Sequence, residues 1–203
     1  MAKNNDYISA PSIQKTPVAT LQYIYLSKPD QFKAPDGTLA APKYSVTVVL
    51  DAKDPVHAKY LKEFNELNDA VGQELLKGIT KDKKSYRIKD ICKEECDDNG
   101  DPTGRYFLKA TTKNKPNVFD SMNKLLTDDI VGKAFGGSTG RVIMGLKKSV
   151  DTQRKTVGLV CYLDKAQLIT IVEGTSSAGG FDAVDGGFVA PEADAGSDDS
   201  VNF

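Results

Sequence analysis

The stretch Tyr44–Leu50 reads YSVTVVL, and it places Tyr44, Val46, Val48 and Leu50 on one side of an alternating pattern. Successive side chains of a strand point to opposite faces, so this alternation predicts a β-strand with one apolar face. Similar short segments, rich in β-branched and aromatic residues, recur along the chain at Val18–Leu26, Ser85–Ile91, Arg105–Thr112, Arg141–Val150, Thr156–Leu163 and Ala166–Val172. Many short strands predict a mainly β protein.

One long helix is predicted directly after Tyr44–Leu50. Asp54 can cap its first turn, Pro55 suits the first helical position, and Gly78 can end it. Between them an apolar stripe recurs at helical spacing: Tyr60, Phe64, Leu67, Val71 and Leu75. Repeated strands with one prominent helix favour a small antiparallel β-barrel over an alternating βαβ sheet.

The formal net charge of −1 hides a strong asymmetry along the chain. Residues 173–203 contain seven acidic residues and no Lys or Arg, which leaves 21 acidic against 27 basic residues in the rest. Gly, Ser, Ala and Asp dominate this segment, so we expect a disordered acidic tail. We therefore divide the chain into an extended arm (1–16), a basic binding domain (17–172) and the tail (173–203).

The residues that could support catalysis or metal binding form no recognisable motif. Cys92, Cys96, Cys161 and His57 could supply four zinc ligands, but their spacing is not that of a zinc knuckle. With one histidine and no phosphate-binding loop in residues 136–141 (GGSTGR), we expect no enzyme, no metal and no cofactor. The absence of a long apolar run and of a secretion signal leads us to expect a cytoplasmic protein without a membrane partner.

The segment Arg105–Ala110 (RYFLKA) is the clearest candidate for a binding strand. Its alternation places Tyr106, Leu108 and Ala110 on one face and Arg105, Phe107 and Lys109 on the other. A face that is basic, aromatic and basic suits unpaired nucleic acid, since bases stack on the ring while cations contact phosphates. An edge strand with Phe107 under a neighbouring loop is the alternative.

Further basic and aromatic residues cluster elsewhere in the positively charged domain. We therefore include eight more DNA-binding candidates: Lys43, Tyr86, Arg87, Lys89, Lys113, Lys115, Arg141 and Lys147. Lys148, Arg154 and Lys155 belong to the same cluster as Arg141 and Lys147. At the end of the chain, Asp198, Asp199 and Phe203 form a peptide that could insert an aromatic ring into a partner's apolar pocket.

These features resemble the single-stranded-DNA-binding proteins of tailed bacteriophages. The matching stretches are Ala41–Asp51 (APKYSVTVVLD), Thr103–Asp120 (TGRYFLKATTKNKPNVFD), residues 140–174 and the acidic tail with its terminal Phe. The resemblance implies an oligonucleotide-binding (OB) barrel that protects single-stranded DNA, without sequence preference, in phage replication or recombination. It also implies a tail that recruits the phage DNA polymerase and helicase in the cytoplasm of the infected bacterial host.

One feature departs from the usual OB barrel, which places its helix between the third and fourth strands. The predicted helix follows the second recognisable strand, so either an early strand lies within Tyr7–Ile13 or the barrel is elaborated. An RNA-binding, cold-shock-like protein and a structural or scaffold phage protein are the alternative functions, and a homo-oligomer stays open.

Overall fold

The computed structural model describes residues 7–33, 37–80 and 82–174, so the predicted tail beyond Gly174 and the first six residues of the arm lie outside it. Its elements are β1 (Tyr7–Ile8), α1 (Pro11–Gln14), β2 (Ala19–Asp30), β3 (Lys43–Asp51), α2 (Pro55–Gly78), a 3₁₀ turn (Lys83–Ser85), β4 (Arg87–Ile88), β5 (Cys92–Cys96), β6 (Pro102–Thr112), β7 (Asn117–Phe119), α3 (Asp128–Val131), β8 (Thr139–Asp151) and β9 (Thr156–Thr170). None of the helices in these ranges has the length and apolar composition needed to cross a membrane.

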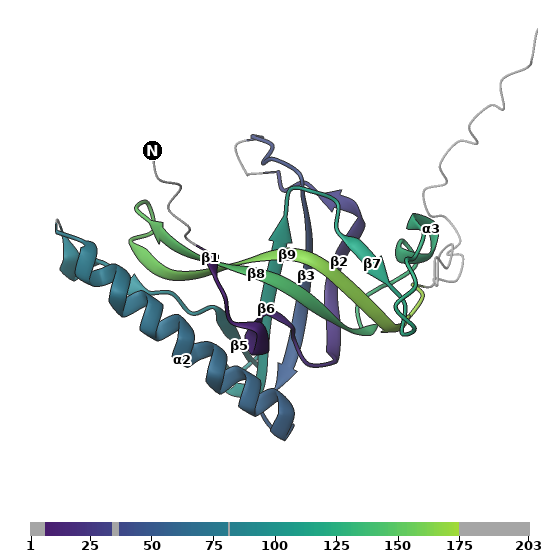
Figure 1. Cartoon of the computed structure of the whole chain (residues 1–203), viewed down its shortest axis with the longest axis horizontal. Coiled ribbons are helices and arrows are strands. Elements are labelled where there is room, and N and C mark those ends of the chain that lie inside the picture. The colour runs from purple at the N-terminus through teal and green to yellow at the C-terminus, as the bar shows by residue number, and fades with distance from the viewer. Residues whose placement is uncertain (1–6, 34–36, 81, 175–203) are drawn as a thin grey trace, which may run out of the picture.

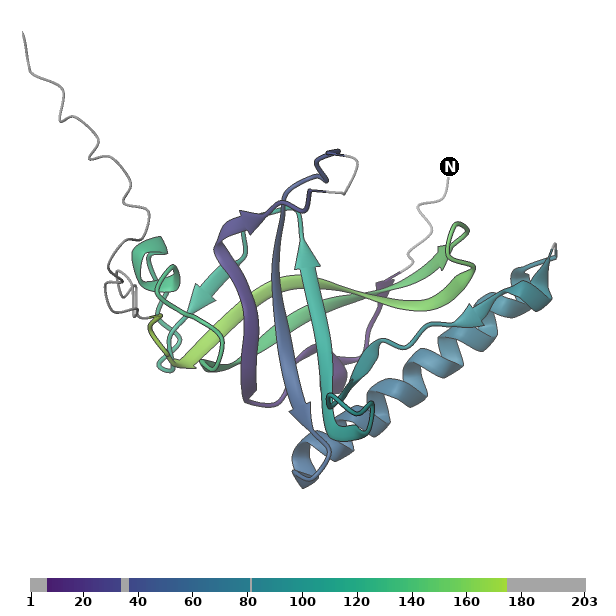
Figure 2. The same cartoon turned by 180° about the vertical axis from the view of Figure 1, so that it is seen from behind.

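Five of the strands close into a barrel (Figures 1 and 2). Antiparallel pairing joins β6 to β3, β3 to β2, β2 to β8 and β8 to β9. A parallel bridge between Thr111 on β6 and Tyr162 on β9 completes the ring. The predicted fold class, a mainly β, OB-like barrel with one prominent helix, is confirmed.

The alternation predicted for β6 is confirmed at Leu108 and Ala110, whereas on β3 both faces are buried, because Ser45, Thr47 and Val49 are only 2–5% exposed. On β3, Val46 and Val48 are fully buried, opposite Ala110 and Leu108 of β6, which are also fully buried. On the opposite face of β6, Lys109 is exposed while Arg105 and Phe107 are partly exposed. The inner faces therefore build the core, and the outer face of β6 stays accessible.

The helix α2 begins and ends as predicted and packs against β9 and β3. One carboxylate oxygen of Asp54 accepts hydrogen bonds from the backbone N–H groups of Val56 (2.7 Å) and His57 (3.1 Å). The buried stripe includes Tyr60, Phe64 and Val71. Because α2 connects β3 to the β4–β6 segment and β1 only pairs with β8 outside the ring, the barrel is an elaborated OB barrel.

Three predicted strands differ from the structure. Most of Ser85–Ile91 is not strand: Ser85 belongs to the 3₁₀ turn, only Arg87 and Ile88 form β4, and the carbonyl of Lys89 accepts from the Asn68 side chain instead of a strand. The segments Thr156–Leu163 and Ala166–Val172 are not separate strands, since β9 is continuous across them. The predicted turn is a bulge: Met144 opposes Leu163 and Ile143 opposes Lys165, which leaves Asp164 as the extra residue.

A buried amide joins α2 to both neighbouring segments of the barrel. The Asn68 Nδ2 atom donates to the carbonyl of Lys89 (3.0 Å), and its Oδ1 atom accepts from the N–H of Leu159 (2.9 Å). Gly158 allows this approach, because a Cβ atom there would lie 2.7 Å from Asn68 Oδ1 and its φ is +144°. Asn68 therefore holds residues 87–91 between α2 and β9.

We expect Asn68→Ala to lower the free energy of unfolding by about 1–3 kcal/mol, because it leaves the buried N–H of Leu159 without a partner. Urea unfolding followed by circular dichroism measures this loss. Gln73→Ala, at an exposed position of the same helix, is the control and should leave stability unchanged. Equal stability of the two variants would show that the amide does not hold this segment.

Candidate nucleic-acid interface

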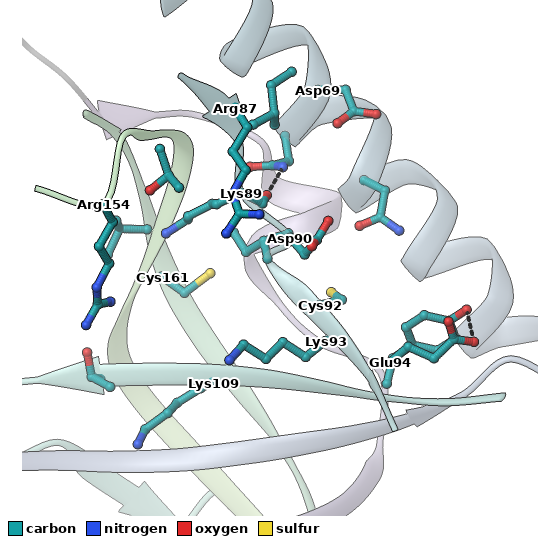
Figure 3. A pocket seen from close by; sticks show the side chains of 18 residues that line it. Asp69, Arg87, Lys89, Asp90, Cys92, Lys93, Glu94, Lys109, Arg154 and Cys161 are labelled. Carbon is teal, nitrogen blue, oxygen red and sulfur yellow. Dashed lines mark hydrogen bonds between the residues drawn. The ribbon is translucent and has the colours of Figure 1, made fainter. Parts of the chain in front are cut away.

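A cleft of about 1140 Å³ lies between α2, residues 87–94, β6 and the β8–β9 hairpin (Figure 3). Five cationic side chains line it: Arg87, Lys89, Lys93, Lys109 and Arg154. Three acidic side chains also line it: Asp69, Asp90 and Glu94. In Figure 3, Asp69 belongs to α2 and Glu94 lies near this helix, whereas the amino groups of Lys93 and Lys109 point away from it. The parts of the cleft outside α2 supply all five cations and two of the three carboxylates, Asp90 and Glu94, and therefore carry a formal excess of positive charge.

Backbone hydrogen bonds fix the two sides of the cleft relative to each other. The N–H of Arg87 donates to the carbonyl of Lys155 (3.0 Å), and that of Lys89 donates to the carbonyl of Val157 (2.9 Å). On the hairpin, the Asp151 carboxylate accepts from the backbone N–H of Arg154 (2.9 Å) and so shapes the turn that carries this arginine. The cations from distant parts of the sequence thus stand on anchored backbone.

The buried thiols of Cys92 and Cys161 form the floor of the cleft and carry no charge at neutral pH. Lys89, which also lines the cleft, is partly buried. Burial raises the pKa of the Cys92 and Cys161 thiols to about 12, so both stay protonated. Burial also lowers the pKa of Lys89, and the nearby Asp151 carboxylate opposes this shift. Burial removes part of the hydration that stabilises the charged Lys89 ammonium, and an anion bound in the cleft would compensate for this loss.

The aromatic part of the surface lies on the outer face of the sheet beside the cleft. Phe107 stands in register between Val49 of β3 and Lys93 of β5. A second cross-strand row contains Tyr25, Ser45, Thr111 and Tyr162, in that order across β2, β3, β6 and β9. Tyr25 and Tyr162 are 38% and 40% exposed. Residues in register share a face, so these rings and the cations of the cleft form one continuous surface.

The structure brings together about half of the residues predicted from sequence. Arg87, Lys89 and Lys109 line the cleft, and Phe107 lies next to it on β6. Tyr86 precedes Arg87, and the Lys155 ammonium lies 5.1 Å from the centre of its ring. The alternative for Phe107 is wrong, because β6 pairs with β3 on one side and β5 on the other and is therefore not an edge strand.

The other predicted residues lie outside the cleft: Lys43, Arg105, Lys113, Lys115, Arg141 and Lys147. Arg105 forms an ion pair with Glu95 (3.1 Å), and Lys115 forms one with Asp128. These two positive charges are therefore already partly neutralised within the protein. These ion pairs form between residues that are not neighbours in the sequence, so the clustering of cations in the sequence does not predict them.

Sequence reasoning left Lys93, Tyr25 and Tyr162 out of the site. Counting back through the turn at residues 97–101 would pair Lys93 with Arg105, but a register shift between Glu94 and Cys96 places it opposite Phe107. Its strand, β5, was not recognised because CKEEC lacks an apolar pattern. Tyr25 joins the surface through the register of β2 with β3, and Tyr162 joins it through the parallel closure of the barrel, neither of which a local pattern predicts.

The zinc alternative finds no support in the arrangement of its residues. His57 accepts a hydrogen bond at Nδ1 from the N–H of Asp51 (3.1 Å) and donates from Nε2 to the carbonyl of Val18 (2.9 Å). Cys92 and Cys161 are buried, whereas Cys96 is exposed. Across residues 7–33, 37–80 and 82–174, no three His, Cys, Asp or Glu side chains group in a way that could hold a metal ion.

Comparison with known proteins gives similarity in structure alone. No protein-family model matches the sequence, and no curated protein matches it significantly. The structure is similar to that of gp2.5, a single-stranded DNA-binding protein encoded by bacteriophage T7, with a TM-score of 0.60 and 18% identity over 87% of this chain and 97% of that one. It is also similar to the single-stranded DNA-binding protein from bacteriophage Enc34 in complex with single-stranded DNA, with a TM-score of 0.58 and 16% identity over 79% of this chain and 88% of that one. At these identities the chain shares the fold of these phage proteins.

Proposed function

We propose that this protein binds single-stranded DNA without sequence preference and has no catalytic role. The observation that carries the proposal is the convergence of five cationic side chains in one cleft beside three partly exposed aromatic rings. Lys and Arg side chains contact phosphates wherever a strand lies, and a ring stacks on any base. Arg87, Lys89, Lys93, Lys109 and Arg154 are the proposed phosphate contacts, and Phe107, Tyr25 and Tyr162 are the stacking platforms.

Single strands fit this surface better than a duplex does. Stacking on Phe107 requires a base whose face is free, and bases inside a duplex are already stacked on each other. Two structural neighbours are single-stranded-DNA-binding proteins, one of them in complex with single-stranded DNA, which supports the same choice of ligand. An RNA-binding protein would use the same cations and rings and differ by contacts to the 2′-hydroxyl.

The wider role that we propose is protection of exposed strands during phage DNA replication or recombination. The domain that spans residues 17–172 would cover DNA, and residues 173–203 would recruit the phage polymerase and helicase through Asp198, Asp199 and Phe203. Support for this division comes from the charge asymmetry, since seven acidic residues and no Lys or Arg occur between Glu173 and the C-terminus. The negative charge of such a segment is complementary to the positively charged surfaces of proteins that themselves bind DNA.

Titration with thymidine oligomers tests the proposal, with the fluorescence of the eight tyrosines as the signal, because the chain has no tryptophan. Affinity should fall with salt, with a log–log slope of about −0.7 for each phosphate contacted. Lys93→Ala/Lys109→Ala should weaken binding and reduce the slope.

Two sets of controls accompany this titration. Lys59→Ala/Lys62→Ala removes two exposed cations from α2, which should leave the slope unchanged. Duplex DNA should bind more weakly than the single strand, and a matched RNA oligomer should bind more weakly than DNA. Equal affinity for duplex and single strand, or no salt dependence, contradicts the proposal, and preference for RNA would assign the protein to the RNA-binding class. Absence of any binding would favour a structural or scaffold role.

Phe107→Ala should weaken single-strand binding by about 1–3 kcal/mol, because one stacking platform is lost. Leu108→Ala should instead lower the free energy of unfolding by about 2–5 kcal/mol, since Leu108 is fully buried. Binding titrations and urea unfolding of both variants separate the two faces of β6. If Phe107→Ala unfolded the domain and Leu108→Ala left it intact, the assignment of the faces would be inverted.

A further inference from the structure

A second pocket with cationic lining, of about 490 Å³, lies on the outer face of the β8–β9 pair. Lys15, Arg141 and Lys165 line it together with Phe119, Met122 and Gln167. The three cations come from three separate parts of the chain: Arg141 from β8, Lys165 from β9, and Lys15 from the segment before β2 that bridges to Ile143. The pocket shares no lining residue with the first cleft.

The side chains of this second pocket leave donors available to an anion. Arg141 Nε donates to the side-chain oxygen of Gln167 (2.7 Å), and within the described part of the chain no other hydrogen bond engages its guanidinium. Lys165 lies 3.6 Å from Asp164, and both side chains are about half exposed, so this pair contributes little. The Asp120 carboxylate accepts from the N–H groups of Met122 (2.9 Å) and Lys124 (2.7 Å) and is therefore occupied by the backbone.

Two tyrosine rings, Tyr7 and Tyr162, lie between this pocket and the first cleft. Moving along the β8–β9 register, the rows after Ile143 and Lys165 are Gly145 with Tyr162, then Lys147 with Val160, and Val160 lines the first cleft. Tyr7 lies over Gly145, with its ring centre 6.3 Å from that of Tyr162. The Lys147 ammonium lies 5.8 Å from the centre of the Tyr7 ring. The distance from Arg141 to Lys147 along β8 is about 20 Å, at about 3.3 Å per residue.

We propose that a single strand bound in the first cleft continues along the outer face of β8–β9, over Tyr162 and Tyr7, into the second pocket. There Lys15, Arg141 and Lys165 bind phosphates, and Phe119 and Met122 contact a base. The charge and the aromatic path both select an unpaired polyanion that carries flat apolar groups, which is the chemistry of single-stranded nucleic acid. This extension rests on the proposed function, because it requires the first cleft to hold the same strand.

The proposal predicts that the second pocket matters for long strands only. Thymidine oligomers of about 6 and about 16 nucleotides, both within the range of site sizes of single OB folds, are titrated against the full-length protein. Lys15→Ala/Lys165→Ala should leave binding of the short oligomer unchanged. For the long oligomer the variant should bind more weakly, with a salt slope smaller by about 1.4, since each of the two phosphates that it no longer neutralises accounts for about 0.7. This variant keeps the hydrogen bond between Arg141 and Gln167, and thermal unfolding verifies its fold.

Lys59→Ala/Lys62→Ala removes the same number of charges from the exposed surface of α2 and should alter neither oligomer's slope. Equal weakening of the short and long oligomers by Lys15→Ala/Lys165→Ala, or no weakening of either, overturns the extended path. Tighter binding of the long oligomer by that variant would also overturn it and assign the pocket to an acidic segment of protein. If the unaltered protein binds neither oligomer, the proposed function itself fails.

Discussion

The hydrogen bonds of Asn68 are the constraint on which the candidate site depends. Residues 87–91 pair with β9 at only two positions, Arg87 with Thr156 and Ile88 with Val157, so strand pairing alone holds this segment weakly. The Asn68 amide adds one bond to the carbonyl of Lys89 and one to the N–H of Leu159. The helix α2, which lies outside the ring of five strands, thereby forms one wall of the cleft. The packing of Ile88 onto Gly72 and the close approach of Asn68 to Gly158 both require glycine at those positions.

The same arrangement explains why cations collect in the cleft although ion pairs are available elsewhere. Arg105 and Lys115 are paired with carboxylates, and exposed pairs of this kind cost the protein little and gain it little. Lys89, in contrast, is partly buried above two protonated thiols, which disfavours its charged form. The free protein therefore holds an unfavourable charge that a phosphate can compensate. A ligand that binds only the folded protein also stabilises it by mass action.

Local patterns in the sequence predicted the parts of the fold that local physics determines. The strands β3 and β6 and the cap and stripe of α2 follow from neighbouring residues and were predicted correctly, but the one-sided burial predicted for β3 was not, because both of its faces are buried. Ser85–Ile91 was mostly wrong because only Arg87 and Ile88 pair with β9, while the carbonyl of Lys89 accepts from the side chain of Asn68 on α2. Candidate residues on a well-predicted strand, such as Phe107 and Lys109, were found for the same reason. Lys93, Tyr25 and Tyr162 join the surface only through register and closure, which no stretch of sequence shows by itself.

The central claim is that a single strand lies in the cleft between residues 87–94 and the β8–β9 hairpin. Lysine acetylation followed by mass spectrometry, with and without a saturating thymidine oligomer, tests it most directly, because it reports each lysine separately. The account predicts strong protection of Lys93 and Lys109, while Lys59 and Lys62 on the exposed surface of α2 react equally in both samples. Protection of Lys59 and Lys62 with unchanged reactivity at Lys93 and Lys109 would place the strand elsewhere and contradict the account.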